Sequence, residues 1–122
     1  MKKILLIEDN EYMGRMYQNL LGLENYLVSW AKGGEEGLEK ATSFKPDLIL
    51  LDVIMPKING IQVLQKLKDS VDTKNIPVVI LTVIGEQDII DKALKLGAEG
   101  YIIKSTVDLS QLISEIKSYL KD

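Results

Sequence analysis

Five polar residues that could act together each follow one of the chain's short apolar runs. Glu8 and Asp9 follow the first run, Asp52 the third, Thr82 the fourth and Lys104 the fifth. The carboxyl ends of parallel strands meet at one edge of a sheet, so three carboxylates, a hydroxyl and an ammonium are expected to gather there. A single strand-terminal acid more often caps a helix or solvates a loop. Three that converge on one edge favour a functional site.

These residue types suit phosphoryl transfer around a hard divalent cation. Mg²⁺ in proteins uses carboxylate oxygens and keeps several waters, and three grouped acids without a cation would raise at least one carboxyl pKa. Asp52 could act as the nucleophile and form an acyl phosphate. The Thr82 hydroxyl and the Lys104 ammonium could each meet a phosphoryl oxygen. No base is placed to drive fast turnover, which indicates a switch rather than a multi-turnover enzyme.

The apolar runs alternate with amphipathic segments in five successive units. The runs are rich in Ile, Val and Leu and lack polar alternation, which is typical of parallel strands buried on both faces. They cover residues 4–7, 27–31, 48–51, 78–81 and 101–103. This order predicts an α/β fold: a flavodoxin-like, three-layer (βα)5 sandwich, doubly wound, with sheet order 2-1-3-4-5. Another five-unit doubly wound fold is the alternative.

Apolar residues between the runs recur at helical spacing and predict five helices. The apolar stripes comprise Met13, Met16, Tyr17, Leu20 and Leu21; Leu38, Ala41 and Phe44; Val63, Leu64 and Leu67; Ile89, Ile90, Ala93 and Leu94; and Leu109, Leu112, Ile113, Ile116 and Leu120. Asp108, with Gln111 three residues later, predicts a capping box at the last helix. Gly14 lies inside the first helix at a cost of about 1 kcal/mol relative to alanine. Trp30 is predicted to be a core residue near the sheet edge.

The composition is that of one globular domain, expected to span residues 1–122. Hydrophobic residues make up 46% of the chain and charged residues 27%, so it can bury a substantial core. The absence of cysteine excludes disulfides, thiolate metal sites and cysteine nucleophiles. No apolar stretch is long enough for a membrane span or a signal peptide, and we expect a cytoplasmic location. A net charge of −3 without basic clusters argues against direct nucleic-acid binding.

Four longer motifs carry a resemblance to a known family. They are ILLIEDN at residues 4–10, PDLILLDVIMP at residues 46–56 followed by Asn59-Gly60, IPVVILT at residues 76–82 and LGAEGY at residues 96–101. Through these motifs the whole chain resembles the receiver domain of two-component response regulators. The resemblance implies phosphorelay signal transduction with Asp52 as the phosphoacceptor. It also implies Mg²⁺, or alternatively Mn²⁺, bound by Asp52, by Asp9 directly, by Glu8 through water and by the main-chain carbonyl of Ile54.

The resemblance further implies a partner on each side of the switch. The phosphoryl donor would be a phosphohistidine on a sensor histidine kinase or histidine phosphotransfer protein, which agrees with the absence of histidine here. Thr82 and Lys104 would engage the phosphoryl group, and the rotamer of Tyr101 would report activation. A core aromatic is the competing interpretation of Tyr101. The surface formed by the fourth helix, fifth strand and fifth helix would then control a downstream effector domain or protein, or form a homodimer.

The chain departs from the family pattern at several positions. Ser105 stands where proline usually follows the lysine, so we expect a trans peptide and a reshaped loop. Val83 replaces a smaller residue and could narrow access for small phosphodonors. Ile54 and Ile84 are apolar where polar residues could orient an attacking water, which predicts a long-lived phosphorylated form and only slow self-dephosphorylation.

Other functions remain in competition at this level. A hydrolase working through an aspartyl phosphate needs a second Asp two residues after the nucleophile, and Ile54 occupies that position. A flavin-binding function lacks a Ser/Thr/Gly-rich phosphate loop after the first run. A phosphorylation-independent, receiver-like interaction module is the remaining alternative, although such domains lose an acid, the Thr or the Lys, and this chain retains them all.

Overall fold

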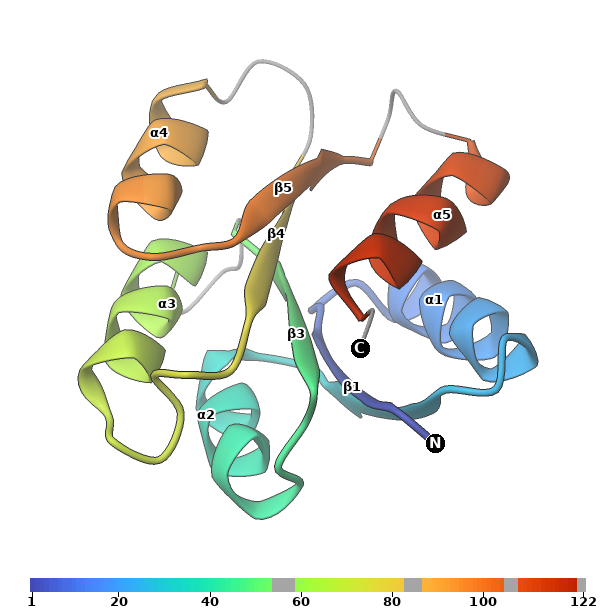
Figure 1. Ribbon diagram of the computed structural model, residues 1–122, viewed down its shortest axis with the longest axis horizontal. Helices are drawn as coiled ribbons and strands as arrows, with labels where there is room; N and C mark the ends of the chain where they lie inside the picture. The colour runs from blue at the N-terminus through green and yellow to red at the C-terminus, as the bar shows by residue number, and fades with distance from the viewer. Residues whose placement is uncertain (54–58, 83–86, 105–107, 121–122) are drawn as a thin grey trace.

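The computed structural model describes residues 1–53, 59–82, 87–104 and 108–120 and contains five strands and five helices in strict alternation (Figure 1). The strands are β1 (Lys3–Ile7), β2 (Leu27–Ala31), β3 (Leu48–Asp52), β4 (Val78–Thr82) and β5 (Gly100–Ile103). The helices are α1 (Glu11–Leu23), α2 (Gly34–Ser43), α3 (Gly60–Asp69), α4 (Gln87–Lys95) and α5 (Leu109–Tyr119). Each predicted strand lies within one residue of its observed bounds.

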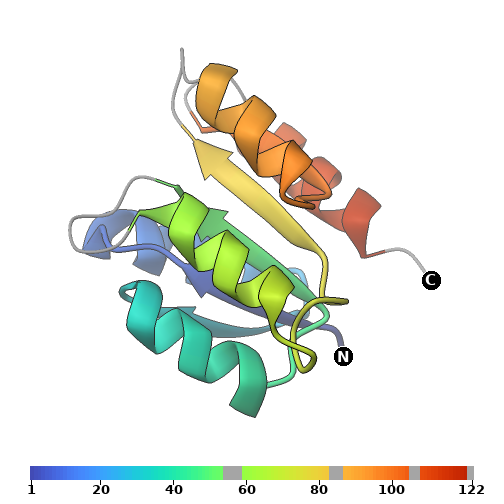
Figure 2. The ribbon, with the colours of Figure 1, turned by 90° about the vertical axis from the view of Figure 1, so that its left-hand side faces the viewer.

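The strands form one parallel sheet in the order β2-β1-β3-β4-β5, as predicted. Helices α1 and α5 cover one face, and α2, α3 and α4 cover the other (Figures 1 and 2). Each face has its own apolar core, one packed around α2, α3 and α4 and one around α1 and α5. The fold is therefore the flavodoxin-like three-layer sandwich.

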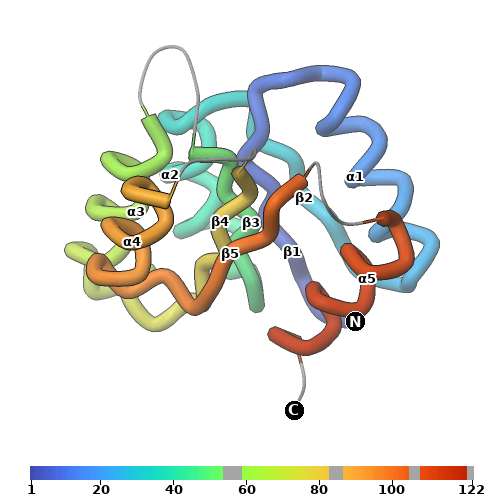
Figure 3. Tube along the Cα trace, turned by 90° about the horizontal axis from the view of Figure 1, so that it is seen from above, coloured from blue at the N-terminus to red at the C-terminus, as the bar shows by residue number. Residues whose placement is uncertain are grey.

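Burial along the strands follows their place in the sheet. Every residue of the central strands β3 and β4 is buried, because helices cover them on both faces. In the edge strand β2 only Ala31 is buried, and Leu27 is exposed. Seen from above, the strands run side by side and are flanked by the helices (Figure 3). Because all five strands are parallel, their carboxyl ends reach the same edge.

Helix starts are defined by side-chain caps where the structure describes them. Asn10 and Asn59 each accept a hydrogen bond from the backbone N–H three residues on, at 2.9 Å and 3.0 Å. The predicted capping box of Asp108 and Gln111 is confirmed, with reciprocal bonds of 2.8 Å and 3.1 Å. These caps fix where α1, α3 and α5 begin.

Two apolar residues predicted on buried stripes are exposed instead. Leu94 is 42% exposed because Ile90 and Ala93 form the buried side of α4. Leu109 is 52% exposed because it is the first residue of α5, one turn before the buried contacts begin at Leu112. The helices themselves are placed as predicted. Within the described part of the chain, none of them is long and apolar enough to cross a membrane.

Candidate functional site

The candidate site lies at the carboxyl edge of the sheet, where β1 and β3 are neighbours. Ile7 pairs with Leu51, so the residues that follow each of them emerge side by side. Asp52 is the last residue of β3 and Thr82 the last of β4. The topology change between β1 and β3 thus brings the predicted site residues of these strands to one place.

Strand β5 brings the predicted lysine to the same edge. Thr82 pairs with Ile103, and the N–H of Lys104 donates to the Thr82 carbonyl at 2.7 Å. The ammonium of Lys104 lies 2.7 Å from Glu8 Oε1 and 3.4 Å from Asp52 Oδ2. Its side chain is only 12% exposed, so these ion pairs are largely shielded from water. The closer partner is Glu8, which the sequence alone did not indicate.

The three acids predicted to converge do so. Glu8, Asp9 and Asp52 each offer a carboxylate oxygen, and these oxygens all lie within 4.8 Å of one another. Oxygens bound to one Mg²⁺ at about 2.1 Å lie at most about 4.2 Å apart, so a small inward shift would place all three around one ion. Glu8 and Asp52 are buried, at 0% and 7% exposed. The donor set fits a hard divalent cation.

Charge balance also favours a cation at this edge. Among the described residues, the Lys104 ammonium lies beside a cluster of three carboxylates. Burial, reinforced by the neighbouring Asp52, raises the pKa of Glu8 to about 7, although Lys104 acts in the opposite direction. Burial also raises the pKa of Tyr17 to about 12, with a further contribution from the charges of Glu8 and Asp52. A divalent cation would offset this excess negative charge.

The remaining predicted site residues have mixed outcomes. Thr82 is 1% exposed at the end of β4. Tyr101 lies on β5 with 41% of its surface exposed, so in this structure it is not a core aromatic. The main-chain carbonyl of Ile54 lies outside the described residues, and so do Val83, Ile84 and Ser105. The expectations attached to those four positions stay predictions.

Sequence reasoning missed two residues that contact the acidic turn. The N–H of Asn10 donates to Glu8 Oε2 at 3.3 Å, in addition to the role of its side chain as the α1 cap. The indole of Trp30, predicted only as a core residue, donates to the main-chain carbonyl of Glu8 at 2.9 Å. The signal for the second contact was Gly14, a gap in the apolar face of α1 that leaves room for the indole.

The geometry defines a class of protein: a doubly wound parallel sheet with a cluster of acids at its switch point that could hold a cation. Comparison with known families matches residues 4–117 to the response regulator receiver domain. The chain belongs to this family.

Individual relatives agree over nearly the full length of the chain. Polar-differentiation response regulator DivK of Brucella anthropi is 32% identical over 121 residues, which cover 99% of this chain and 98% of that protein. The BeF3-activated N-terminal receiver domain of Klebsiella pneumoniae RstA matches with a TM-score of 0.89 and 27% identity, covering 99% of this chain and all of that one. The Mn²⁺-bound form of response regulator Rcp1 matches with a TM-score of 0.82 and 30% identity, covering 98% and 94%.

Proposed function

We propose that this receiver domain accepts a phosphoryl group on Asp52 in a reaction that depends on Mg²⁺, with Mn²⁺ as an alternative ion. The observation that supports it most is the convergence of Glu8, Asp9 and Asp52, with the Lys104 ammonium 3.4 Å from the Asp52 carboxylate. The Mn²⁺-bound form of Rcp1 and the BeF3-activated RstA domain are consistent with a divalent ion and a phosphoryl-like group in this family.

In the proposed transfer, a carboxylate oxygen of Asp52 attacks the phosphorus of a phosphohistidine on a partner protein. The new P–O bond forms as the P–N bond breaks, and the imidazole leaves with the electron pair and takes up a proton. Lys104 shifts from Glu8 and Asp52 to a phosphoryl oxygen, and the Thr82 hydroxyl donates to another. Asp9 and Asp52, with Glu8 acting through water, would hold the cation, which would supply positive charge beside the phosphoryl oxygens.

The donor and the output both lie on partners in this proposal. The chain contains no histidine, which agrees with a phosphohistidine on a sensor histidine kinase or histidine phosphotransfer protein as the donor. The acyl phosphate carries about −1.5 to −2 charges beside Thr82 and Lys104, in place of the single charge of the Asp52 carboxylate. When Thr82 and Lys104 move toward the phosphoryl group, the half-exposed Tyr101 can turn inward, and the α4–β5–α5 surface changes shape. That surface would contact a downstream domain, an effector protein or a second copy of the chain. The domain thus acts as a switch and not as a multi-turnover enzyme.

Labelling followed by intact mass measurement tests this proposal. The wild-type chain, incubated with Mg²⁺ and either phosphoramidate or a phosphorylated histidine phosphotransfer protein, should gain the mass of one phosphoryl group. Asp52→Asn should gain none, and chelation of Mg²⁺ should prevent the gain. Asp47→Asn is the matched control, because Asp47 lies before β3 at the opposite end of the sheet and bonds the N–H of Lys3. No gain with either donor would favour a phosphorylation-independent interaction module.

A further inference from the structure

Strand β2 holds the main chain of Glu8 on both sides. The Glu8 N–H donates to the Ala31 carbonyl at 3.0 Å, and the Glu8 carbonyl accepts from the Trp30 indole N–H at 2.9 Å. Strand β1 ends at Ile7, so both bonds attach the acidic turn to β2 just beyond the last strand residue. The Glu8 carbonyl belongs to the peptide unit that links Glu8 to Asp9. The indole therefore orients the peptide plane from which the Asp9 side chain departs.

The indole itself is fixed from several directions. Its ring lies against Gly14 of α1 so closely that a Cβ at position 14 would overlap the ring carbons. The Lys40 ammonium donates to the Trp30 carbonyl at 3.0 Å. The Lys32 ammonium lies 5.0 Å from the ring centroid and also pairs with Glu11. Because its backbone and ring are both held, Trp30 presents its N–H in one orientation.

We propose that Trp30 is a positioning residue, which holds the Glu8–Asp9 peptide by its indole N–H and thereby sets the affinity of the acidic cluster for a divalent cation. The inference rests on the proposed function. The three carboxylates repel one another when no cation is present. This repulsion favours movement of the turn that carries Glu8 and Asp9 away from Asp52. The bond from Trp30 opposes that separation and keeps the ligand oxygens within reach of one ion. Gly14 is the residue that makes this arrangement sterically possible.

The test measures the Mn²⁺ dissociation constant from the electron paramagnetic resonance signal of the free ion, which needs no tryptophan. Trp30→Phe keeps an aromatic side chain on β2 next to α1 but removes the N–H donor. Loss of one hydrogen bond should weaken Mn²⁺ binding about five-fold, equivalent to about 1 kcal/mol. Val28→Ala is the matched control, because Val28 packs on the same core from the same strand but pairs with Ile4, away from the acidic turn. It should lower stability without changing Mn²⁺ affinity.

Two further variants separate positioning from folding. Benzothienylalanine at position 30 keeps the indole shape and replaces the N–H by sulfur, so it should weaken Mn²⁺ binding as Trp30→Phe does. Gly14→Ala keeps the indole but displaces the ring, so it should also weaken Mn²⁺ binding. In the double variant with Trp30→Phe, the loss of Mn²⁺ affinity should be smaller than the sum of the two single losses, because both changes act on the same hydrogen bond. If both position-30 variants bind Mn²⁺ with wild-type affinity, the role of Trp30 is overturned while the proposed function stands. A wild-type chain that binds no Mn²⁺ would overturn the proposed function as well.

Discussion

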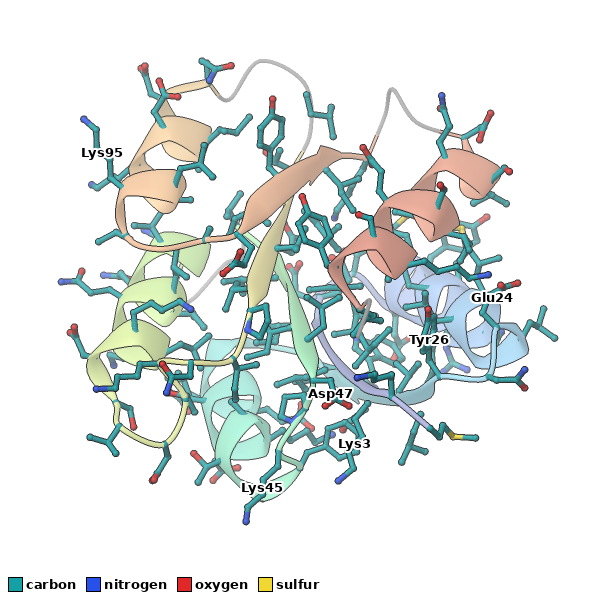
Figure 4. All side chains as sticks on the ribbon, in the orientation of Figure 1. Lys3, Glu24, Tyr26, Lys45, Asp47 and Lys95 are labelled. Atoms are coloured by element: carbon teal, nitrogen blue, oxygen red, sulfur yellow. The ribbon has the colours of Figure 1, made fainter. Side chains whose placement is uncertain are left out.

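Charged side chains lie at both ends of the sheet, but their surroundings differ. At the amino end, the N–H of Lys3 donates to Asp47 Oδ2 at 2.7 Å, the N–H of Asp47 donates back to the Lys3 carbonyl at 2.8 Å, and the Lys3 ammonium donates to the Phe44 carbonyl at 3.2 Å. Figure 4 shows Lys3 and Asp47 next to each other there. These groups are satisfied by near neighbours, and Asp47 is exposed to water.

The carboxyl end has the opposite balance. Among the residues that the structure describes, the Lys104 ammonium pairs with Glu8 and Asp52, and Asp9 lies close to both of these acids. Glu8, Asp52 and Lys104 are largely shielded from water. Buried like charges are costly unless something compensates them. At the amino end the charged groups are exposed or paired with near neighbours, whereas the carboxyl end gathers buried acids whose negative charge a divalent cation would offset. Substitutions at the two ends should therefore have effects of different size and different dependence on pH and on Mg²⁺.

The largest difference is expected when each end loses its lysine. Lys104→Met removes the ammonium that pairs with both Glu8 and Asp52, and breaking such a buried pair typically costs several kcal/mol. In the absence of divalent ions we expect a loss of about 3 kcal/mol in the free energy of unfolding above pH 7. Urea unfolding monitored by circular dichroism measures it, and saturating Mg²⁺ should recover part of the loss.

Lys3→Met is the matched change at the amino end. It removes one bond to the Phe44 carbonyl and the contact of the ammonium with the Phe44 ring, and should cost less than about 1 kcal/mol. Mg²⁺ should not alter that cost. Equal losses in the two variants would contradict the view that buried charge controls stability more strongly at the carboxyl end than at the amino end.

The next effect concerns pH and Glu8. Its pKa is raised from 4.5 to about 7 in the folded chain, so folding favours the protonated carboxyl. That contribution to stability is fully present below pH 4.5 and is lost as the pH rises through 7. Without divalent ions, the wild-type free energy of unfolding should fall over this interval by on the order of 2 kcal/mol more than that of Glu8→Gln. Chemical unfolding at a series of pH values measures both curves.

The matched condition for the pH experiment is saturating Mg²⁺. A bound cation stabilises the charged form of Glu8, so the extra fall in wild-type stability should become smaller. Identical pH dependence of wild type and Glu8→Gln without divalent ions would show that burial of Glu8 does not control this end of the sheet.

The same contrast explains what could be predicted from the sequence. Apolar runs without polar alternation identify buried parallel strands, and parallel strands place Asp52, Thr82 and Lys104 at one edge whatever the loops do. The preference of Lys104 for Glu8 could not be predicted, because it depends on side-chain reach across the sheet. The Trp30 bond depends on how closely β2 packs on α1 at Gly14, a tertiary distance with no sequence period. The prediction that Leu94 is buried was wrong because helical spacing alone does not define how wide the buried stripe of a helix is.

The smallest effect is expected at the amino end, where strain and not charge is at issue. Lys45, which Figure 4 shows at this end, has a φ of 53°, in the left-handed region that costs a side chain about 1–2 kcal/mol. Lys45→Gly removes that strain but increases the conformational entropy of the unfolded chain. We therefore expect the free energy of unfolding, measured with urea or heat, to rise by about 0.5 kcal/mol. Lys66→Gly, within α3, should instead cost about 1 kcal/mol. Mn²⁺ affinity should match wild type in both variants; a change in Lys45→Gly would mean that the two ends of the sheet are energetically coupled.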